Sequence, residues 1–210
     1  MTPTVRPRAL PAVPSRALQS GALAALAALL AVLAGWSVEA AAQERLGALD
    51  PAHTRIRFEL RTRWGQKVLG EFPAFEGEVL ALPGDRRQVR IRLRTDAVEV
   101  AGSERYTRIA RSEGFFDAAR HPLIEFVSDP HPAELVRDGG PLRGRLSMHG
   151  VTHEETFEVK PASCTRPGVD CPVMAAGSVD RRRYGLDGYR VVLGHQVRFG
   201  MQLRLRPAGG

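Results

Sequence analysis

The chain has 210 residues, a formal net charge of +7 at pH 7 and an aromatic content of only 6%. Nearly all of its basic residues are arginines, and glutamates are interleaved with them along the chain. A nucleic-acid-binding surface gathers basic residues beside exposed aromatic side chains, so this composition argues against one. This moderate excess of basic over acidic residues is typical of a soluble protein with some attraction to anionic lipid headgroups.

The first 42 residues have the layout of a secretory signal peptide. An arginine-containing leader precedes the uncharged apolar run Ala22–Ala34, and an A-x-A cleavage signal ends at Ala42. A helix of that run spans about 20 Å, short of the ~30 Å hydrocarbon core, which disfavours the alternative of an uncleaved anchor. We therefore expect cleavage, export to the bacterial periplasm, and one domain over residues 43–210. Loss of three arginines and one glutamate lowers the net charge from +7 to +5.

Beyond the leader, apolar and polar residues alternate with period two, which predicts strands with one buried and one wet face. Residues 89–94 read V-R-I-R-L-R, and residues 197–206 continue the same alternation over a longer run. Shorter stretches at 55–61, 75–81, 124–126, 142–148 and 156–160 follow it too. Turn residues such as Pro83-Gly84-Asp85 separate the runs.

One region, from Ser103 to Ala119, breaks this rhythm and predicts one or two short helical turns, with Ser103 and Ser112 as N-caps. It ends near the pair Phe115-Phe116. We expect this pair to lie at one end of a barrel, either as part of the core or in contact with a ligand.

Cys164 and Cys171 are the only cysteines. In an oxidising compartment a nearby pair predicts a structural disulfide, worth roughly 2.5 kcal/mol on the chain-entropy estimate. A redox pair or half of a metal site is the alternative, but the spacing is not C-x-x-C.

Together these elements predict an all-β fold, an extended antiparallel up-and-down barrel of about eight strands with one or two short helices. The strand arginines would face water. Small residues at inward positions (Gly70, Gly77, Ala81 and Gly144) either leave room for a ligand or accommodate a neighbouring aromatic ring. The apolar pattern alone does not distinguish a cavity from a filled interior.

We expect the interior to hold an apolar chain through side chains that perform no chemistry. The candidates for a polar mouth are Tyr106, Tyr184 and Arg181. The residues predicted to line the cavity are Phe58, Phe72, Phe75, Val79, Ile91, Leu93, Phe115, Phe116, Phe126, Leu146, Met148, Phe157, Tyr184, Phe199, Met201 and Leu203.

Four segments resemble, in the right order, the YceI-like family. They are D-P-A-H-T-R-I-R-F at 50–58 with V-L-G-E-F-P-A-F-E-G at 68–77, R-S-E-G-F-F-D-A-A-R-H-P-L-I-E-F-V-S at 111–128, L-R-G-R-L-S-M-H-G-V-T at 142–152, and V-D-R-R-R-Y-G-L at 179–186. The resemblance covers residues 48–206. It implies a lipocalin-like barrel in the periplasm that binds a polyisoprenoid or a similar amphiphilic lipid, such as a quinone with an isoprenoid tail, and it implies no other cofactor.

The chain departs from this pattern in two places. Many relatives carry an Asp and a His where this chain has Tyr106, Thr107 and Arg108, and the opening strand often bears a His near Arg63-Trp64. Headgroup contacts at those positions are therefore not carried over. The cysteine-bridged loop also resembles an addition.

The sequence gives little support for a metal site or for catalysis. His149 and His153 have the spacing of a helical metal pair, but Gly150-Val151-Thr152 between them predicts a hairpin turn, so we expect solvated histidines and no metal. No G-x-S-x-G, H-E-x-x-H or Gly-rich phosphate loop occurs, which favours a binding protein over an enzyme. Two alternatives stay open, a lipid-acting enzyme and a filled barrel that is an accessory to a membrane redox system. The expected partners are the lipid and a membrane surface or membrane redox protein.

Overall fold

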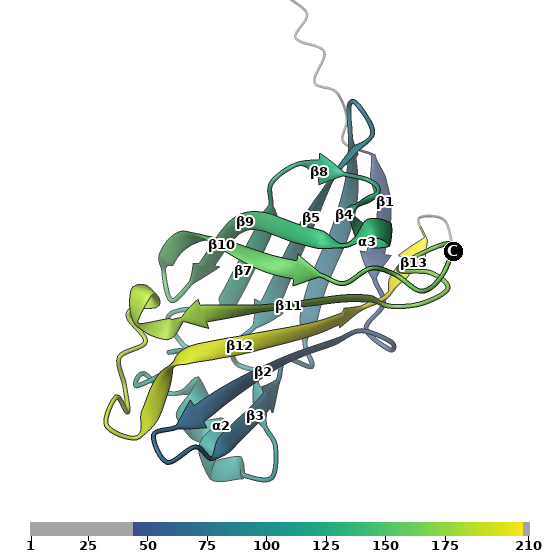
Figure 1. Ribbon diagram of the computed structural model, residues 1–210. Helices are drawn as coiled ribbons and strands as arrows, with labels where there is room; N and C mark the ends of the chain where they lie inside the picture. The colour runs from purple at the N-terminus through teal and green to yellow at the C-terminus, as the bar shows by residue number, and fades with distance from the viewer. Residues whose placement is uncertain (1–43, 208–210) are drawn as a thin grey trace, which may run out of the picture. The chain divides into compact units, whose positions relative to one another are not determined.

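The computed structural model describes residues 44–207, so the predicted leader and its cleavage lie outside the described residues. The predicted fold class is confirmed: these residues form a curled antiparallel sheet with a few short helices (Figure 1). Within this range, no helix has the length and apolar character that crossing a membrane requires.

Thirteen strand segments belong to the sheet. The helical elements are α2 (Glu104–Arg111), α3 (Leu135–Asp138) and the 3₁₀ helix η1 (Arg181–Tyr184). The strands are β1 (Arg45–Leu49), β2 (Arg55–Thr62), β3 (Lys67–Glu71), β4 (Phe75–Leu82), β5 (Arg86–Arg94), β6 (Glu99–Val100), β7 (Leu123–Ser128), β8 (His131–Pro132), β9 (Gly140–Met148), β10 (Val151–Val159), β11 (Val173–Asp180), β12 (Leu193–Leu203) and β13 (Leu205–Pro207).

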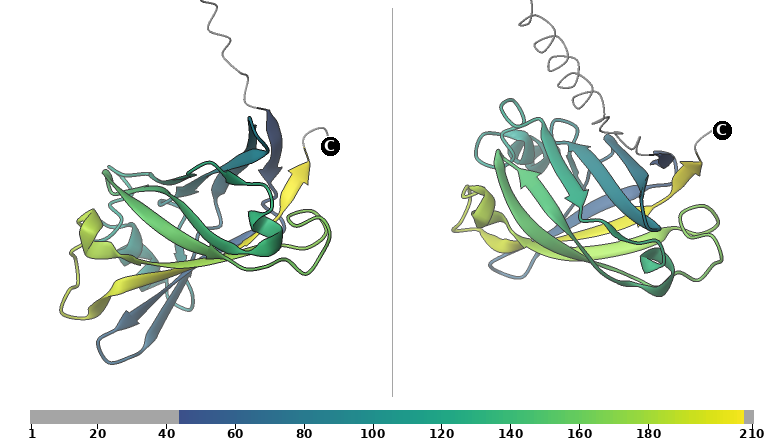
Figure 2. Two further views of the ribbon diagram at one scale, coloured as in Figure 1. Left: turned by 45° about the horizontal axis from the view of Figure 1, so that its top comes forward. Right: turned by 90° about the horizontal axis from the view of Figure 1, so that it is seen from above.

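Neighbouring strands pair antiparallel in the order β4, β5, β7, β9, β10, β11 and β12. The strand β12 then pairs with β2, while its continuation β13 pairs with β1, which itself pairs with β4. Because β12 continues into β13, the sheet curls back on itself, and the first and last strands of the chain, β1 and β13, are hydrogen-bonded to each other. Two further views show the strands arranged around a common interior (Figure 2).

The expectation of about eight strands was too low. The predicted alternating runs correspond to β2, β4, β5, β7, β9, β10 and β12–β13, whereas β1, β3, β6, β8 and β11 fall outside them. Residues 50–54 separate β1 from β2, residues 72–74 separate β3 from β4, and Arg204 separates β12 from β13. At the last interruption the backbone N–H of Arg204 donates to Thr54 Oγ1 at 3.0 Å. The backbone N–H of Asp50 donates to the Arg204 carbonyl at 2.8 Å. Alternation of side chains does not reveal such breaks, because apolar residues continue on both sides of them.

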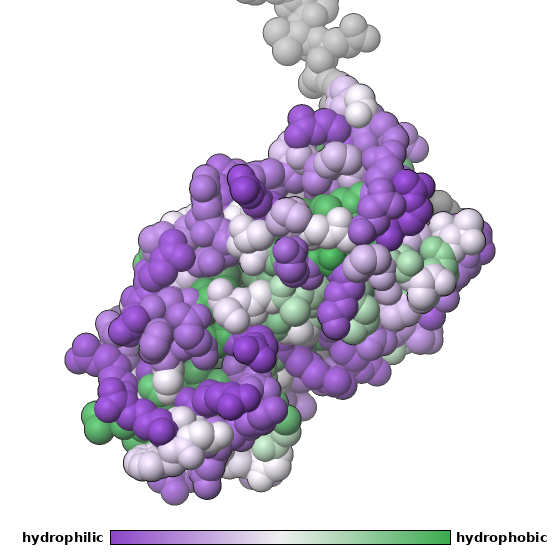
Figure 3. Space-filling view, viewed as in Figure 1, coloured by the Kyte–Doolittle hydropathy of each residue, from purple (hydrophilic) through white to green (hydrophobic). Residues whose placement is uncertain are grey.

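Inward and outward faces follow the predicted alternation in most strands. In β12, Val197 and Phe199 are buried and Arg198 between them is exposed. Arginines of β5 point outward, where the Arg92 Nε donates to Glu125 Oε1 at 2.7 Å. The face shown in Figure 3 is mostly hydrophilic. The interior is therefore apolar and the outer surface charged.

One strand departs from its predicted face. In β4, Val79 was predicted to line the cavity but is only half-buried, whereas the neighbouring Leu80 is buried. The pairing of β4 with β1 contains a register irregularity between Arg45 and Gly47. The irregularity lies on the β1 side, because β4 pairs with β5 in unbroken register from Phe75 to Leu82.

Glycines lie directly beneath aromatic rings of the interior. A Cβ added to Gly70 would lie 2.2 Å from the Phe58 ring, and one added to Gly144 would lie 2.7 Å from the Phe126 ring. Such distances leave no room for a side chain. Of the two roles considered for the small residues at 70 and 144, the structure shows the second, since neighbouring rings occupy the space.

The helical segment is shorter than predicted. Ser103 is the N-cap of α2, and its side chain accepts a hydrogen bond from the backbone N–H of Tyr106. Ser112 is wrong as an N-cap, because it is the C-cap of α2 and its hydroxyl donates to the Ile109 carbonyl at 2.8 Å. Turns follow it up to residue 120.

The predicted disulfide between Cys164 and Cys171 is confirmed, with a Cα–Cα distance of 6.1 Å. It closes the loop between β10 and β11. An ion pair between Arg166 and Asp170, 2.7 Å apart, lies inside the same loop. The disulfide therefore constrains the surface loop between β10 and β11.

Candidate functional site

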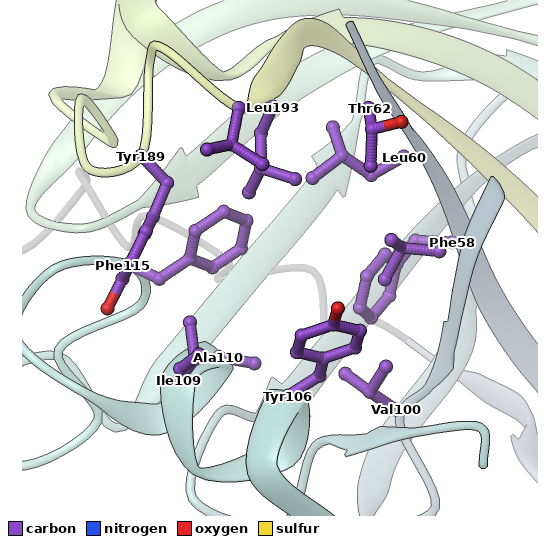
Figure 4. Close-up of a pocket in the computed structure, with 12 residues that line it drawn as sticks. Phe58, Leu60, Thr62, Val100, Tyr106, Ile109, Ala110, Phe115, Tyr189 and Leu193 are labelled. Carbon is purple, nitrogen blue, oxygen red and sulfur yellow. The ribbon is translucent and has the colours of Figure 1, made fainter. Parts of the chain in front are cut away.

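A largely apolar cavity of about 100 Å³ lies between α2, β2, β3 and the loop before β12 (Figure 4). Its polar groups are the hydroxyls of Thr62, Tyr106 and Tyr189. The other lining residues are Phe58, Leu60, Val68, Val100, Ile109, Ala110, Phe115, Val192 and Leu193.

Hydrogen bonds to two neighbouring segments hold the walls of this cavity in place. Thr107 in α2 accepts the backbone N–H of Val100 on its Oγ1 at 2.9 Å, and Arg111 Nε donates to the Val98 carbonyl at 3.0 Å. On the opposite wall, the backbone N–H of Arg63 donates to the Val192 carbonyl at 2.8 Å. The helix and the loop before β12 are thus fixed relative to the β2–β3 hairpin.

Two smaller apolar cavities lie deeper in the interior. One, of about 30 Å³, is lined by Ile56, Ile91, Leu93, Ile124, Phe126, Leu146, Phe157, Phe199 and Met201. The other, of about 40 Å³ beside α3, shares Ile91, Phe126 and Met201 with it and adds Val89, His131, Leu135, Val136, Leu142, Val159, Val173, Ala175 and Leu203. Each of the three is well below the ~300 Å³ at which small-molecule sites begin.

The strand β12 passes all three cavities. Leu193 lines the cavity beside α2, Phe199 the deepest one, and Met201 both the deepest one and the one beside α3. From Leu193 to Leu203 a strand extends about 33 Å at ~3.3 Å per residue. The cavities therefore follow one elongated path through the interior.

The aromatic residues predicted to line a cavity fill much of this path. Phe58, Phe72 and Phe116 pack together with ring centroids 5.6 to 6.2 Å apart, and Phe115 lies 4.8 Å from Phe116. Phe157 contacts both Phe126 and Phe199 farther along. Edge-to-face contacts of this kind stabilise a packed interior.

The structure places the remaining predicted lining residues in different environments. Met148 is buried in the core, while Val79 is half-buried. Phe75 is half-buried and borders a separate, partly polar groove with Arg90 and Arg206. Residues that sequence reasoning missed include Ile109, Tyr189 and Val192, because a short helix and a loop carry no period-two signal.

Two of the three residues expected at a polar mouth are buried instead. Tyr184 is fully buried, and its hydroxyl donates to Glu155 Oε1 at 2.9 Å. Burial, together with that hydrogen bond, raises the pKa of Tyr184. Arg181 is 1% exposed, so neither residue is open to a ligand headgroup from solvent. Tyr106 does border the cavity and is half exposed.

The Arg181 guanidinium is enclosed by backbone carbonyls. Its Nε donates to Gly194 at 2.9 Å, and its Nη1 donates to Gly188 at 2.8 Å and also to Leu186. The same group lies 5.8 Å from the centroid of the Phe115 ring. Burial lowers the pKa of Arg181. The side chain holds the loop that forms one wall of the cavity beside α2.

Asp180 and Asp50 both accept backbone hydrogen bonds at the start of a turn. Asp180 is the N-cap of η1, where its carboxylate accepts the backbone N–H and the side chain of Arg182. These contacts lower the pKa of Asp180 to about 2. Asp50 accepts the backbone N–H of Ala52 and contacts His53 Nδ1 at 2.6 Å. Both carboxylates stabilise turns.

The histidines of the β9–β10 hairpin were expected to be solvated, but both contact η1. His149 Nδ1 lies 3.2 Å from the Tyr184 carbonyl, and His153 Nε2 lies 3.0 Å from the Arg183 carbonyl. The hairpin turn falls at His149-Gly150 rather than at 150–152.

A different trio of side chains could hold a metal ion. Ligand atoms of Asp117, His121 and His149 lie within 4.8 Å of one another, and the two imidazole rings are 4.4 Å apart. Such donors suit zinc and similar ions. The Asp117 carboxylate also accepts Arg120 Nε at 2.6 Å, so an ion there would share this carboxylate with a guanidinium.

Comparisons with known proteins agree with this geometry. A UPF0312 protein of Staphylococcus aureus strain USA300 is 26% identical over 165 residues, covering 71% of this chain and 91% of that protein. Among solved structures, Burkholderia cenocepacia BcnA matches with a TM-score of 0.61 and 16% identity, over 74% of this chain and 98% of that one.

A second solved structure is a polyisoprenoid binding domain from Saccharophagus degradans implicated in plant cell wall breakdown. It matches with a TM-score of 0.61 and 13% identity, over 79% of this chain and all of that one. At such identities these structures establish the fold alone. The sequence model of the YceI-like domain matches residues 48–205, and the chain therefore belongs to the YceI-like family.

Proposed function

We propose that the protein binds a polyisoprenoid or a similar amphiphilic lipid, such as a quinone with an isoprenoid tail, and carries or stores it in the periplasm without transforming it. The observation that carries this proposal is the elongated row of three apolar cavities along β12. The leader supports export, and the polyisoprenoid binding domain from Saccharophagus degradans shares the fold.

The driving force for such binding is large. Each buried CH₂ contributes about 0.8 kcal/mol, so one five-carbon isoprene unit contributes roughly 4 kcal/mol before ordering costs. Few polar groups line the path, so little cost of desolvating polar groups offsets this gain. The binding energy therefore comes from burial of the tail. The length and width of the path determine which tails fit.

The present cavities are too small for a long tail, so binding requires the interior to open. Phe58 borders the cavity beside α2, and its cross-strand partner Phe199 borders the deepest cavity. Movement of these rings and of Phe116 would join the two spaces. Aromatic side chains that turn in this way convert separate voids into a continuous channel.

A second candidate function follows from the same small volumes. A barrel filled by its own side chains would be an interaction module, accessory to a membrane redox system, and would hold no lipid. Organic extraction of the purified protein followed by mass spectrometry distinguishes the two. A stoichiometric isoprenoid supports the carrier. A clean protein whose melting temperature does not respond to geranylgeraniol or to a short-chain quinone supports the filled module.

The entrance lies at the end of the sheet near α2, where apolar side chains are exposed around the cavity. Trp64 is 73% exposed and Val191 is 79% exposed. Exposed cations, including Arg63, Lys67 and Arg190, flank them. Apolar side chains ringed by cations fit the interface of an anionic bilayer, from which a lipid would be loaded.

Vesicle flotation tests this docking. The variant with both Trp64→Ser and Val191→Ser should lose most of its binding to vesicles that contain anionic lipid. The matched control is Leu123→Ser, which changes an exposed leucine on β7. Equal flotation of the wild type and the double variant would refute this entrance.

A further inference from the structure

Three metal-ligating side chains from two distant parts of the chain converge on one place. Asp117 and His121 lie in the turns that follow α2, and His149 lies in the turn between β9 and β10. One ligand atom of each lies within 4.8 Å of those of the other two, and the two imidazole centroids are 4.4 Å apart. In a tetrahedral zinc site with bonds of about 2.0–2.1 Å, neighbouring ligand atoms are about 3.4 Å apart, so side-chain movements of about 1 Å would place all three around one ion.

Hydrogen bonds of the backbone hold Asp117 and His121 on a single turn. The backbone N–H of His121 donates to the Asp117 carbonyl at 2.8 Å, and the backbone N–H of Asp117 donates to the Ser112 carbonyl at 2.9 Å. The hydroxyl of Thr95 donates to the His121 carbonyl at 2.7 Å. The backbone of these two ligands is therefore in position before any ion binds.

The β9–β10 hairpin supplies the third ligand. His149 and Gly150 both have positive φ, 53° and 76°, as in the two-residue turns that suit hairpins. A Cβ added to Gly150 would lie 3.1 Å from Cε1 of His121. Because glycine has no side chain there, the His121 ring lies close against the turn that carries His149.

The hydrogen bond of His149 leaves one of its nitrogens available to a metal. Its Nδ1 lies 3.2 Å from the Tyr184 carbonyl, and because a carbonyl only accepts, Nδ1 carries the proton and Nε2 keeps its lone pair. A metal-ligating imidazole ordinarily donates its other N–H to a carbonyl or a carboxylate, which fixes the tautomer and orients the ring. The contact with η1 gives His149 this arrangement.

The Asp117 carboxylate is almost buried, with 7% of its side chain exposed. Arg120 Nε donates to its Oδ2 at 2.6 Å, and a carboxylate has a second acceptor oxygen, so Oδ1 remains for an ion. The same guanidinium also pairs with Glu113 at 2.5 Å. The charge of Arg120 therefore keeps a partner when an ion shares the Asp117 carboxylate.

We propose that Asp117, His121 and His149 bind one zinc ion or a similar divalent transition metal, with water completing the coordination. Two imidazoles and one carboxylate suit zinc, whereas magnesium and calcium prefer oxygen ligands throughout. The ion ties the turns after α2 to the β9–β10 hairpin. Phe115, in those turns, lines the cavity beside α2, so the ion stabilises one of its walls. The metal site does not depend on the proposed lipid binding.

Calorimetric titration of the tag-free protein, first treated with a chelator, with zinc chloride tests the site. We expect binding of one equivalent of Zn²⁺ and a rise in melting temperature, because an ion that binds only the folded state stabilises it. Co²⁺ should give the visible absorption bands of a low-coordinate nitrogen and oxygen site. Magnesium chloride at the same concentration should neither bind nor compete.

His149→Asn removes the imidazole but keeps a residue that readily adopts positive φ, so the hairpin turn is retained. The affinity for Zn²⁺ should fall by at least about tenfold, since loss of a partner outside the ligand set already weakens metal binding by about 10–100-fold. His121→Gln should weaken it similarly. The matched control is His153→Asn, because His153 lies in the same hairpin but contacts the Arg183 carbonyl, and it should keep the wild-type affinity.

Two results would overturn the proposal. One is the absence of saturable Zn²⁺ binding by the wild type. The other is wild-type affinity in both His149→Asn and His121→Gln, or an equal loss in His153→Asn, since either would place the ion elsewhere. Circular dichroism verifies folding of each variant. Where His149→Asn does not fold, the wild-type titration and His121→Gln decide.

Discussion

Replacing Arg181 with leucine should loosen the wall of the cavity beside α2. The guanidinium donates to the carbonyls of Gly194, Gly188 and Leu186, so one side chain fixes both ends of the loop before β12. Tyr189, Val192 and Leu193 of this loop line the cavity. Leucine keeps apolar contacts near the Phe115 ring but satisfies none of the carbonyls.

The expected magnitude follows from those three hydrogen bonds. Hydrogen bonds to charged groups are worth about 1.5–3 kcal/mol each, and the variant also avoids the cost of burying a cation. We therefore expect a net loss of roughly 3 kcal/mol in the free energy of unfolding. For a domain of this size that corresponds to a fall of roughly 6–12 °C in melting temperature.

Urea denaturation measures the loss, and hydrogen exchange locates it. Amides of residues 186–193 should exchange faster in the variant, while those of β9 and β10 keep their protection relative to global unfolding. The matched control is Arg182→Leu, because Arg182 is exposed and pairs with Asp180 at 2.6 Å. Surface pairs contribute at most about 1 kcal/mol. If both variants lose the same stability, or if residues 186–193 keep their protection, the assigned role of Arg181 is refuted.

Three further outcomes can be measured. Phe126→Arg should abolish lipid retention, assayed by mass spectrometry of extracts, whereas Leu123→Arg on the exposed side of β7 should not; the reverse order would contradict an interior site. Asp180→Asn should remove part of the dependence of stability on pH. The Asp180 pKa of about 2 lies below its ordinary value of 3.8, so the carboxylate stabilises the fold above pH 3.8 and this contribution fades as the pH falls toward 2. Identical curves of unfolding free energy against pH for the variant and the wild type would exclude this. Reduction of the bridge between Cys164 and Cys171 should lower the free energy of unfolding by about 2.5 kcal/mol in urea titrations with and without reductant, and a change near zero would show that the loop is already rigid.

Much of the fold was predictable because burial of alternate side chains is a local property of a strand. Ile56, Phe58 and Leu60 in β2 are all buried, as their spacing predicts. The disulfide was predictable from the spacing of its cysteines and the expected compartment. The strands β1, β3, β6, β8 and β11 were not, because they are short or lack clear period-two alternation and are held by pairing with other strands.

The site was predictable in part. Phe126, Phe157 and Phe199 border the deepest cavity, as inward parity indicates. Tyr184 and Arg181 were misplaced because a polar side chain near a turn is ordinarily exposed, and only tertiary contacts supply them with buried partners.

The glycines beneath the aromatic rings have a consequence for selectivity. With no side chain at Gly70 or Gly144, the rings of Phe58 and Phe126 occupy the space where a Cβ would lie. A methyl group at Gly144 would also meet the Val127 carbonyl oxygen at 2.5 Å, and one at Gly70 the Glu99 carbonyl oxygen at 2.9 Å, so either would disturb strand pairing as well as the ring. The width available to a branched hydrocarbon therefore depends on two backbone positions at which the ring and the neighbouring strand both approach closely.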